Sequence, residues 1–388
     1  MKAVVLDADW APRGDLKLTP EQIAARWTIN ANLTWQHPRV RIEERPVPGA
    51  PSPDEVVLQV GACGICGSDV HMFETDKDGY IFIPYRLALP VVAGHEFSGK
   101  VVEVGKDVRN IRKGDLVAVE EIQWCGACRA CRGGFLNQCD NIQDLGFTVD
   151  GGYQEYTTVK AKYCWSLSRV AERLGSEELA LEAGALCEPT SVSYEGMFTR
   201  AGGIKPGSTV AVFGGGPIGL AAVALASAAG ASQVFSLERM PGRMALAREM
   251  GATMTLDPVT DDAVAAIMDA TDGAGVDMMV ETTGNFQPVL NTCQQILGVA
   301  SKVVIVGMEP THPNIDLLQF QLRGASLYGT VGHSGGWDFP NVIRLMASGK
   351  IDMRKAVTKR VGLEGLLGAI DDTKKRLEGK ILVKPSLG

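Results

Sequence analysis

The sequence has no run of 18 apolar residues and no cluster of basic residues. The first absence argues against a membrane-spanning helix, which needs about 20 apolar residues to cross the hydrocarbon core of a bilayer. The second absence, with a net charge of −7, argues against nucleic acid or an anionic membrane as a partner. The apolar run near the start, Ala3-Val-Val-Leu6, is short and is followed by aspartates, so we expect no signal peptide.

Internal repeats and low-complexity segments are also absent from the sequence. Nine cysteines without an export signal predict a reducing compartment, where thiolates stay available to bind metal, and we therefore expect a cytoplasmic protein. A hydrophobic share of 45% and a charged share of 21% are typical of a globular protein. The length of 388 residues exceeds that of a usual single core, so two domains are expected.

The pattern of expected secondary structure changes near residue 206. Before it, short β-rich runs at 55–60, 97–104 and 115–119 are separated by Gly, Pro and Asp, as in an all-β, partly open barrel. After it, predicted strands alternate with predicted helices, which indicates βαβ units, a parallel sheet and the α/β class. The expected strands are 209–213, 233–237, 276–280 and 302–306, and the expected helices are 218–229 and 243–250.

Four cysteines lie close together in a glycine-rich segment with the spacing C-x2-C-x2-C-x7-C: Cys125, Cys128, Cys131 and Cys139. Tetrahedral zinc takes four thiolates at about 2.3 Å, and gaps of two residues let a tight turn present them together. The spacing therefore predicts a closed structural zinc site in a lobe at about residues 120–140. Two disulfides, ordinary buried cysteines and an iron–sulfur cluster are the alternatives.

A glycine-rich loop joins the first predicted strand of the second domain to the helix that follows. Gly214, Gly216 and Gly219 fit the pattern G-x-G-x-x-G. Between a strand and a helix, the first glycine permits a tight turn, the second allows the backbone to approach a pyrophosphate, and the third lets helix pack on strand. The free N–H groups of the helix then face the phosphates. The loop therefore predicts a bound dinucleotide, the alternative being a purely structural turn.

Glu238 ends the next predicted strand, 19 residues after Gly219. A carboxylate at this point accepts hydrogen bonds from the ribose hydroxyls of NAD and repels the 2′-phosphate of NADP. Arg239 acts against this preference, because a neighbouring arginine holds a 2′-phosphate. We predict NAD as the cofactor. The other residues expected at the cofactor are Pro217, Ile218, Arg243 and Val306.

Two further segments supply candidate ligands for a second metal ion. Cys66 opens the run Cys66-Gly-Ser-Asp-Val-His71, and His95 and Glu96 follow Gly94. With a later acid they form an open site of thiolate, imidazole and carboxylate that leaves a position for water or substrate. Zinc there acts as a Lewis acid that lowers the pKa of an alcohol. The alternatives are structural roles for Cys66 and His95, or a zinc-binding or redox pair of Cys63 with Cys66.

Together these motifs resemble the zinc-dependent medium-chain alcohol/polyol dehydrogenase family over nearly the whole chain. The matching segments are Cys66–His71, Gly94–Glu96, the four-cysteine segment, Glu188-Pro-Thr-Ser-Val192, the glycine loop and Glu238. The resemblance implies a GroES-like, β-rich catalytic domain at 1–188 and a Rossmann domain, with a doubly wound parallel sheet, at 189–334. It implies that residues 335–388 return to the catalytic domain.

The resemblance also implies the roles of the site residues. By this resemblance Cys66 and His95 bind the catalytic zinc, and Glu188 stands at the third ligand position. In the sorbitol and threonine dehydrogenase branch, however, Glu96 binds the zinc directly and Glu188 holds the zinc-bound water. Both carboxylates are therefore candidates. The reaction implied is hydride transfer from an alcohol to NAD, with the proton leaving through Ser68 and then His71. Two zinc ions per chain are expected, in a homodimer or homotetramer assembled through the cysteine lobe and an edge strand at 327–331.

The substrate class rests on the same resemblance. The branch suggests a polyol, sugar or cyclitol, and the segment 146–153 and a polar insertion at 10–40 resemble those of inosose-type dehydrogenases. We expect an inosose-like cyclitol; the alternatives are a linear sugar alcohol, a threonine-type substrate, or a non-enzymatic NAD(P)H sensor or structural protein. The insertion, with three tryptophans, is either a substrate lobe or an oligomer contact. The polar groups considered for hydroxyl binding are Glu120, Glu121, Trp124 and His333.

Overall fold

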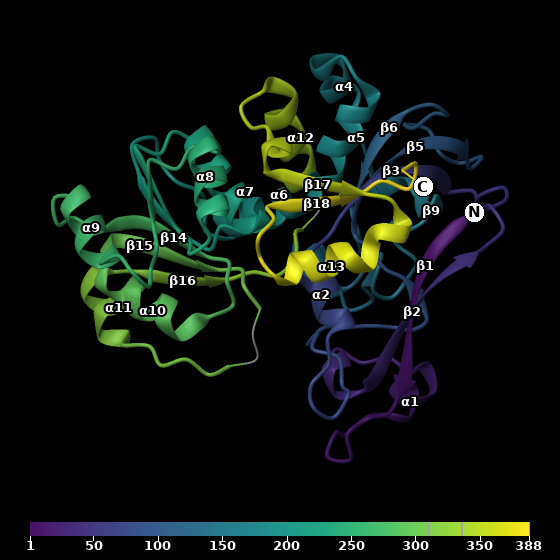
Figure 1. Cartoon of the computed structure of the whole chain (residues 1–388), viewed down its shortest axis with the longest axis horizontal. Coiled ribbons are helices and arrows are strands. Elements are labelled where there is room, and N and C mark those ends of the chain that lie inside the picture. Colours follow the sequence, from purple (N-terminus) through teal and green to yellow (C-terminus); the bar gives the residue numbers. More distant parts are fainter. Residues whose placement is uncertain (309–310, 335–336, 388) are drawn as a thin grey trace. The chain divides into compact units, whose positions relative to one another are not determined.

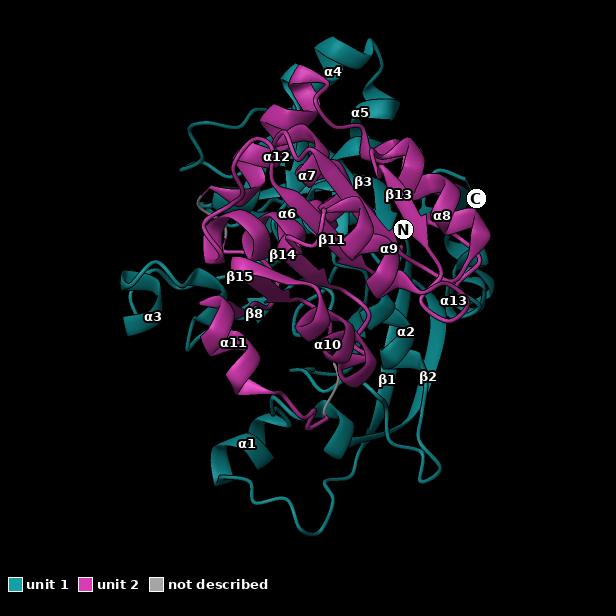
Figure 2. Ribbon diagram, turned by 90° about the vertical axis from the view of Figure 1, so that its left-hand side faces the viewer, with its two compact units in different colours: residues 1–188, 359–375, 381–388 teal, residues 189–358, 376–380 magenta. Residues whose placement is uncertain are grey.

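The computed structural model describes residues 1–308, 311–334 and 337–387. The chain divides into two compact units, which we describe separately (Figures 1 and 2). The first unit comprises Met1–Glu188, Lys359–Lys375 and Ile381–Gly388. The second comprises Pro189–Thr358 and Arg376–Lys380.

The first unit is rich in antiparallel strands. Its main sheet has seven strands in the order β10-β6-β5-β3-β18-β17, with β9 also paired to β3. These strands are β3 (Glu55–Gly64), β5 (Glu96–Val104), β6 (Leu116–Val119), β9 (Tyr156–Lys160), β10 (Cys164–Ser166), β17 (Val357–Val361) and β18 (Lys380–Val383). Two smaller sheets are formed by β1 (Lys2–Trp10), β2 (Trp35–Glu44) and β4 (Val91–Val92), and by β7 (Ile122–Gln123) and β8 (Gln143–Asp144). The expected β-rich domain is confirmed.

Short helices connect or cover these strands. The α-helices of the first unit are α1 (Pro20–Ala25), α2 (Gly67–Phe73), α3 (Arg129–Arg132), α4 (Ser168–Leu174), α5 (Glu177–Ala185) and α13 (Leu366–Lys374). The 3-10 turns are η1 (Ala31–Leu33), η2 (Leu136–Gln138), η3 (Ala161–Tyr163) and η6 (Leu363–Gly365). The helix α2 matters most for the site, because Cys66 precedes it directly.

The insertion at 10–40 is an excursion between the paired strands β1 and β2. Trp10 lies opposite Trp35 in the register, and their rings make an edge-to-face contact at 5.0 Å. Trp35 is buried and donates its indole N–H to the carbonyl of Leu87 at 3.3 Å. In contrast, the residues of α1 are all partly or fully exposed. The base of the excursion is therefore anchored, while its helix meets solvent.

The second unit contains a six-stranded parallel sheet in the order β13-β12-β11-β14-β15-β16. Renumbered within the unit, this is the 3-2-1-4-5-6 order of the Rossmann fold, which confirms the expected α/β class. The strands are β11 (Thr209–Phe213), β12 (Gln233–Leu237), β13 (Met254–Leu256), β14 (Val276–Glu281), β15 (Leu297–Ile305) and β16 (Ser326–Gly329). The run of buried residues in β11 is typical of a parallel strand covered on both faces.

Helices flank this sheet on both sides. In Figure 1, α7 and α8 lie above the sheet, and α10 and α11 lie below it. The helices of the second unit are α7 (Pro217–Ala228), α8 (Pro241–Glu249), α9 (Ala263–Ala270), α10 (Phe286–Gln295), α11 (Leu317–Arg323) and α12 (Asp338–Ser348), with α6 (Cys187–Tyr194) at the junction. A π-helical turn, η4 (Glu195–Arg200), continues α6, and η5 (Met353–Ala356) precedes β17. Within the described residues, no helix has the length and apolar character to cross a membrane.

The chain returns to the first unit at Lys359, later than the sequence suggested. The expected boundary at residue 335 falls outside the described residues, and α12 still belongs to the second unit. Two hydrogen bonds within that unit hold this helix: the Thr199 hydroxyl donates to Asp338 at 2.7 Å, and Asn341 donates to the Tyr194 hydroxyl at 2.9 Å. Local strand and helix patterns carry no information about such partners.

Candidate active site

Three predicted ligands come together in the first unit. The ligand atoms of Cys66, His95 and Glu96 lie within 4.8 Å of one another. Cys66 comes directly before α2, and Glu96 is the first residue of β5, which pairs with β3 so that Glu96 stands opposite Gly64. A Cβ on Gly64 would lie 2.0 Å from Oε2 of Glu96, so this position must be glycine for the carboxylate to fit. We name these three residues the metal triad.

Asp69 and Tyr153 support the metal triad from behind. Asp69 is fully buried, and its Oδ2 accepts hydrogen bonds from the backbone N–H of Cys66 and from the Tyr153 hydroxyl, both at 2.8 Å. Its Oδ1 lies 3.6 Å from Nδ1 of His95. A carboxylate behind a metal-binding histidine orients the ring and raises its basicity. Asp69 lies inside the motif used above but was given no role there, and Tyr153 carried no signal that we recognised.

The electrostatics of this group follow from its burial. Burial disfavours the charged imidazolium of His95, but the Asp69 carboxylate and Cys66 outweigh it and hold the pKa of His95 well above its usual value. Burial and the same Asp69 carboxylate raise the pKa of Tyr153, which therefore remains a neutral hydroxyl donor. The donor set of thiolate, imidazole and carboxylate fits zinc with an open coordination position.

Ser68 and His71 lie on α2 beside the metal triad. The Ser68 hydroxyl is 3.5 Å from Nε2 of His95. His71 is three residues further, on the same side of the helix, and is half exposed, with its Nδ1 3.7 Å from a Glu74 oxygen. Ser68 therefore lies next to the metal triad, and His71 on the same side of α2 is partly exposed to solvent.

Glu188 lies outside the metal triad. It begins α6 with Cys187, and its carboxylate is within 4.8 Å of the carboxylate of Glu121. Both acids are buried, with exposed fractions of 5% and 4%.

The four cysteines of the lobe form a second group, with their sulfur atoms within 4.8 Å of one another. Backbone N–H groups point at the sulfurs: those of Ala127 and Cys128 donate to Cys125, and that of Cys131 donates to Cys128, each at 3.4 Å. The two bonds that Cys125 accepts lower its pKa to about 6, whereas burial raises the pKa of Cys131 to about 12. No disulfide joins any of the nine cysteines, all of which lie in the described residues. Four convergent sulfurs supported by amide donors fit a closed structural zinc site.

The glycine loop of the second unit has the geometry of a dinucleotide cradle. Gly214 adopts φ = +100°, in the region that favours glycine, and a Cβ on Gly219 would lie 1.8 Å from the Gly214 carbonyl oxygen. The loop follows β11 where the strand order reverses between β11 and β14, and ligands of such sheets bind at the carboxyl ends of the strands there. Pro217 occupies the first turn of α7, where its missing N–H costs nothing.

Glu238 lies against this loop. Its Oε2 accepts the backbone N–H of Gly215 at 2.7 Å, and its Oε1 accepts those of Arg239 and Met240 at 2.6 and 2.9 Å. The Arg239 side chain is exposed. Arg243 is buried and donates to the carbonyl of Glu378 at 2.8 Å, and burial lowers its pKa.

The remaining predicted cofactor residues lie near the same strand ends. Val306 directly follows β15 and donates its N–H to the carbonyl of Glu281 at 2.9 Å. The carbonyl of Ile218 accepts from the Ser193 hydroxyl at 2.7 Å.

The polar residues considered for hydroxyl binding divide into distinct groups. Glu120 accepts hydrogen bonds from the indoles of Trp124 and Trp165 at 3.1 and 3.0 Å, so Glu120 and Trp124 support the lobe. Glu121 instead approaches Glu188. His333 is buried in the second unit, with its ring 4.8 Å from that of Phe339.

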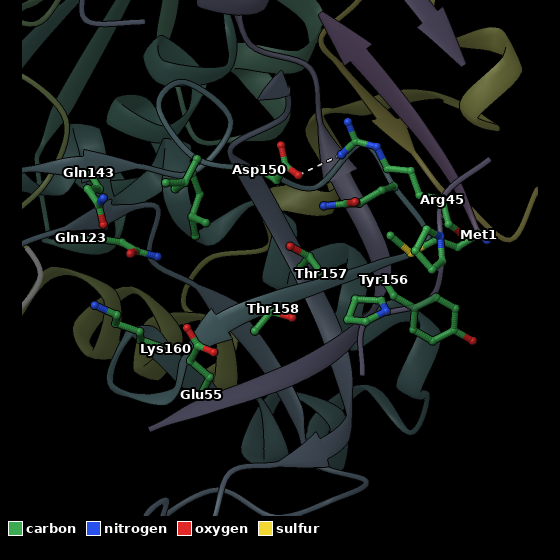
Figure 3. A pocket seen from close by; sticks show the side chains of 15 residues that line it. Met1, Arg45, Glu55, Gln123, Gln143, Asp150, Tyr156, Thr157, Thr158 and Lys160 are labelled. Carbon is green, nitrogen blue, oxygen red and sulfur yellow. Dashed lines mark hydrogen bonds and ion pairs between the residues drawn. The ribbon is translucent and has the colours of Figure 1, made fainter. Parts of the chain in front are cut away.

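An open cavity of about 580 Å³ lies elsewhere in the first unit, beside β9 (Figure 3). Tyr156 and Lys160 of β9 line it, and an ion pair of Arg45 with Asp150 at 3.0 Å borders it. None of the predicted ligands is among its lining residues.

Comparisons with known proteins agree with this geometry. Residues 52–169 match the family model "Alcohol dehydrogenase GroES-like domain", and residues 217–348 match "Zinc-binding dehydrogenase". The chain is 44% identical to scyllo-inosose 3-dehydrogenase of Thermotoga maritima, over 100% of this chain and 99% of the relative.

Solved structures show the same relationship. An alcohol dehydrogenase structure from Thermotoga maritima superposes with a TM-score of 0.95 at 42% identity, covering 99% of each chain. A zinc-binding dehydrogenase from Sinorhizobium meliloti, bound to NADP, superposes with a TM-score of 0.78 at 32% identity, covering 90% of this chain and 96% of that one. With its two zinc-type donor sets and its dinucleotide loop, the chain belongs to the zinc-dependent medium-chain alcohol/polyol dehydrogenases, oxidoreductases that use zinc and a nicotinamide cofactor.

Proposed function

We propose that this enzyme transfers hydride between NAD and the secondary alcohol or ketone of a cyclitol, with an inosose-like compound as substrate. The observation that carries the proposal is the open metal triad of Cys66, His95 and Glu96 with Ser68 beside it. The substrate class is supported by the name of the relative that is 44% identical over the whole chain, a scyllo-inosose dehydrogenase.

The metal triad would hold the catalytic zinc. Bound there, zinc supplies a Lewis acid that favours the ionised form of an alcohol. Glu96 is our proposed direct ligand, because its carboxylate lies within 4.8 Å of the Cys66 and His95 ligand atoms, whereas Glu188 does not belong to that group. Asp69 holds the His95 ring in place through the Nδ1 side.

Residues of α2 would move the proton. The Ser68 hydroxyl takes the proton of the substrate alcohol and passes its own towards His71, whose half-exposed ring delivers it to solvent. Such relays act by positioned hydroxyl and imidazole groups within hydrogen-bond reach of the proton that they carry.

NAD is our proposed cofactor in preference to NADP. The Glu238 carboxylate is fixed against the loop by three backbone N–H groups, so it remains where a 2′-phosphate would have to lie. Gly214, Gly216 and Gly219 would cradle the pyrophosphate, with Pro217, Ile218, Arg243 and Val306 around it.

We propose that the chain is a cytoplasmic homodimer or homotetramer. The strand β16 forms an edge of the parallel sheet, and exposed edges need pairing or cover. Leu327 on this strand and Leu317, Leu318 and Leu322 on α11 are exposed leucines of the same unit. Sedimentation of a monomer at micromolar concentration would contradict this assembly.

A substrate screen tests the proposal. NAD reduction, and NADH oxidation in the reverse direction, are measured with inositols, inososes, linear polyols, threonine, aldoses and ethanol. We expect a cyclitol or its ketone to give the highest kcat/KM. Ethanol or a longer alkyl alcohol as the best substrate would overturn the cyclitol assignment. Activity restricted to linear polyols would instead favour the linear alternative, in line with the relative named a probable D-xylulose reductase, which is 31% identical over 87% of this chain.

A further inference from the structure

Two buried carboxyl groups meet in the second unit. Glu195 opens the π-helical turn η4, and Asp338 opens α12. Their exposed fractions are 1% and 0%, and a hydrogen bond joins the two side chains. This bond therefore ties η4 to the start of α12. We name Glu195 and Asp338 the acid pair.

Three uncharged groups donate hydrogen bonds to the acid pair. The Ser334 hydroxyl lies 2.8 Å from a Glu195 oxygen and 3.4 Å from Oδ2 of Asp338. The backbone N–H of Ser334 donates to the same Asp338 oxygen at 2.9 Å. The Thr199 hydroxyl donates to the other Asp338 oxygen at 2.7 Å. Ser334, in the segment after β16, is thus held by both acids at once.

The acid pair shares a proton, because two like charges buried in contact repel each other. Burial, and after it the Asp338 carboxyl group, raise the pKa of Glu195 to about 7. His333, in the segment after β16, is a second titratable group that acts on Glu195; it lowers this pKa, but less strongly than burial and Asp338 raise it. Below pH 7 Glu195 therefore carries the proton, and the acid pair holds a single negative charge.

The turn that carries Glu195 packs on the carboxyl ends of β15 and β16. A Cβ on the next residue, Gly196, would lie 2.9 Å from Cγ1 of Val304 and 3.2 Å from Cγ2 of Thr330, both uncharged side chains. A Rossmann sheet binds a dinucleotide in two halves; Glu238 marks β11 to β13 as the adenosine half, which leaves β14 to β16 for the nicotinamide half. Oγ1 of Thr330 is buried and has no hydrogen-bond partner within residues 1–308, 311–334 and 337–387. Since buried polar groups normally have partners, this hydroxyl indicates a ligand at the end of β16.

We propose that the acid pair is a positioning device for cofactor binding: with one proton between them, Glu195 and Asp338 hold Ser334, and through it the segment after β16, in the shape that accepts the nicotinamide half. The proposed function gives neither acid a role, and the inference uses only the nicotinamide cofactor of the family. When Glu195 ionises, two negative charges come into contact, and the Ser334 hydroxyl has a single proton to donate to them. The acid pair then separates, and fewer molecules have the shape that binds the cofactor.

Calorimetric titration of the full chain with NADH at pH 6, 7 and 8 tests this inference. NADH is chosen because its nicotinamide ring is uncharged and does not itself respond to the charge of Glu195. We expect the Kd to rise about 10-fold from pH 6 to pH 8, since only about a tenth of the molecules keep the Glu195 proton one pH unit above its pKa. The affinity falls with pH because the form that binds is the protonated one, and its population decreases as the pH rises.

Four variants make the test specific. Glu195→Gln keeps a hydrogen-bond donor towards Asp338 without a charge, so its Kd at pH 6 should lie within about 3-fold of the native value and stay constant up to pH 8. Asp338→Asn removes the other charge and should also abolish the pH dependence; it carries the test if Glu195→Gln does not fold. Glu195→Ala removes the hydrogen bond and should raise the Kd at pH 6 about 10-fold. Glu249→Gln, at an exposed acid of α8 in the same unit, is the control and should keep the native pH dependence.

Three outcomes would overturn the inference. The first is a native Kd that changes less than about 2-fold between pH 6 and pH 8. The second is the same pH dependence in Glu195→Gln as in the native protein, and the third is a native Kd at pH 6 in Glu195→Ala. NADPH is titrated in parallel, so tighter binding of NADPH with the same pH dependence would contradict the proposed cofactor and still support the inference. The substrate class is tested separately, because no substrate is present in these titrations.

Discussion

Replacement of Asp69 by asparagine tests whether the buried carboxylate organises the metal triad. In the native protein this fully buried carboxylate accepts two hydrogen bonds at 2.8 Å, from the Cys66 N–H and the Tyr153 hydroxyl. Each hydrogen bond to a charged acceptor contributes about 1.5–3 kcal/mol. The asparagine side chain would keep one acceptor oxygen and turn an amide N–H towards the other donor. We therefore expect Asp69→Asn to lower the free energy of unfolding by about 2–3 kcal/mol.

The same substitution should weaken zinc binding at the catalytic site. Asp69 lies 3.6 Å from Nδ1 of His95, and loss of such an outer-shell partner lowers metal affinity or activity by about 10- to 100-fold. Chelator competition, with the metal at the four-cysteine site counted separately, measures this affinity, and thermal denaturation measures the stability.

Tyr153→Phe is the matched control for Asp69→Asn. It removes one of the same hydrogen bonds but leaves the carboxylate in place beside His95. We expect it to lower stability by about 1–3 kcal/mol, with a smaller loss of zinc affinity. Equal zinc affinities in Asp69→Asn and the unchanged protein would refute the role given to Asp69, even if stability fell.

Four other variants test separate parts of the molecule. Cys128→Ala should lower thermal stability, because structural zinc contributes folding free energy. Cys66→Ala should instead remain folded and bind NAD, but without enzymatic activity. Metal analysis and calorimetry check both variants. Glu238→Ser should narrow the kcat/KM ratio of NAD to NADP. Burial, and after it the Asp338 carboxylate, raise the pKa of Glu195 from 4.5 to about 7. The free energy of unfolding should therefore fall as the pH rises from 4.5 to about 7, by at most about 3 kcal/mol, and should stay constant at higher pH. Denaturation of Glu195→Gln should show a flatter pH dependence.

Each of these expectations has a clear contrary result. Equal unfolding of Cys128→Ala and Cys66→Ala would contradict the division between structural and catalytic sites. A native preference for NADP would contradict the role of Glu238. The stability should fall with pH at Glu195 because, between the two pKa values, the folded protein keeps a proton that the unfolded chain has lost. A rise in stability over the same pH interval would refute this reasoning.

The sequence predicted those parts of the site whose residues lie close together in the chain. The four cysteines fall in one short segment, and the glycine loop joins adjacent elements, so spacing alone indicated both. Donor type alone grouped Cys66 with His95 and Glu96 as a candidate open metal site, and the family resemblance added their roles. Their proximity depends on the antiparallel register of β3 and β5, which sets Gly64 opposite Glu96 and which no local pattern shows.

Other features depend on partners that are distant in the sequence. Tyr153 reaches Asp69 across 84 positions of the chain, so neither residue could be recognised as a support of the metal triad from its neighbours. Glu120 and Glu121 are chemically identical and adjacent, but Glu120 accepts hydrogen bonds from the indoles of Trp124 and Trp165, whereas Glu121 approaches Glu188. The late return at Lys359 likewise depends on which unit binds α12.

The position of β18 has a consequence for the order in which the protein acquires its metals during synthesis. This strand pairs with β3, with Leu382 opposite Gly64 and Val383 opposite Cys63, in the segment Cys63-Gly-Ile-Cys66. The ribosome must therefore have made the chain as far as β18 before the sheet around Cys66 is complete. The four-cysteine lobe needs no such distant strand, and domains generally begin to fold as they emerge. We expect a nascent chain to load its structural zinc first and its catalytic zinc only near the end of translation.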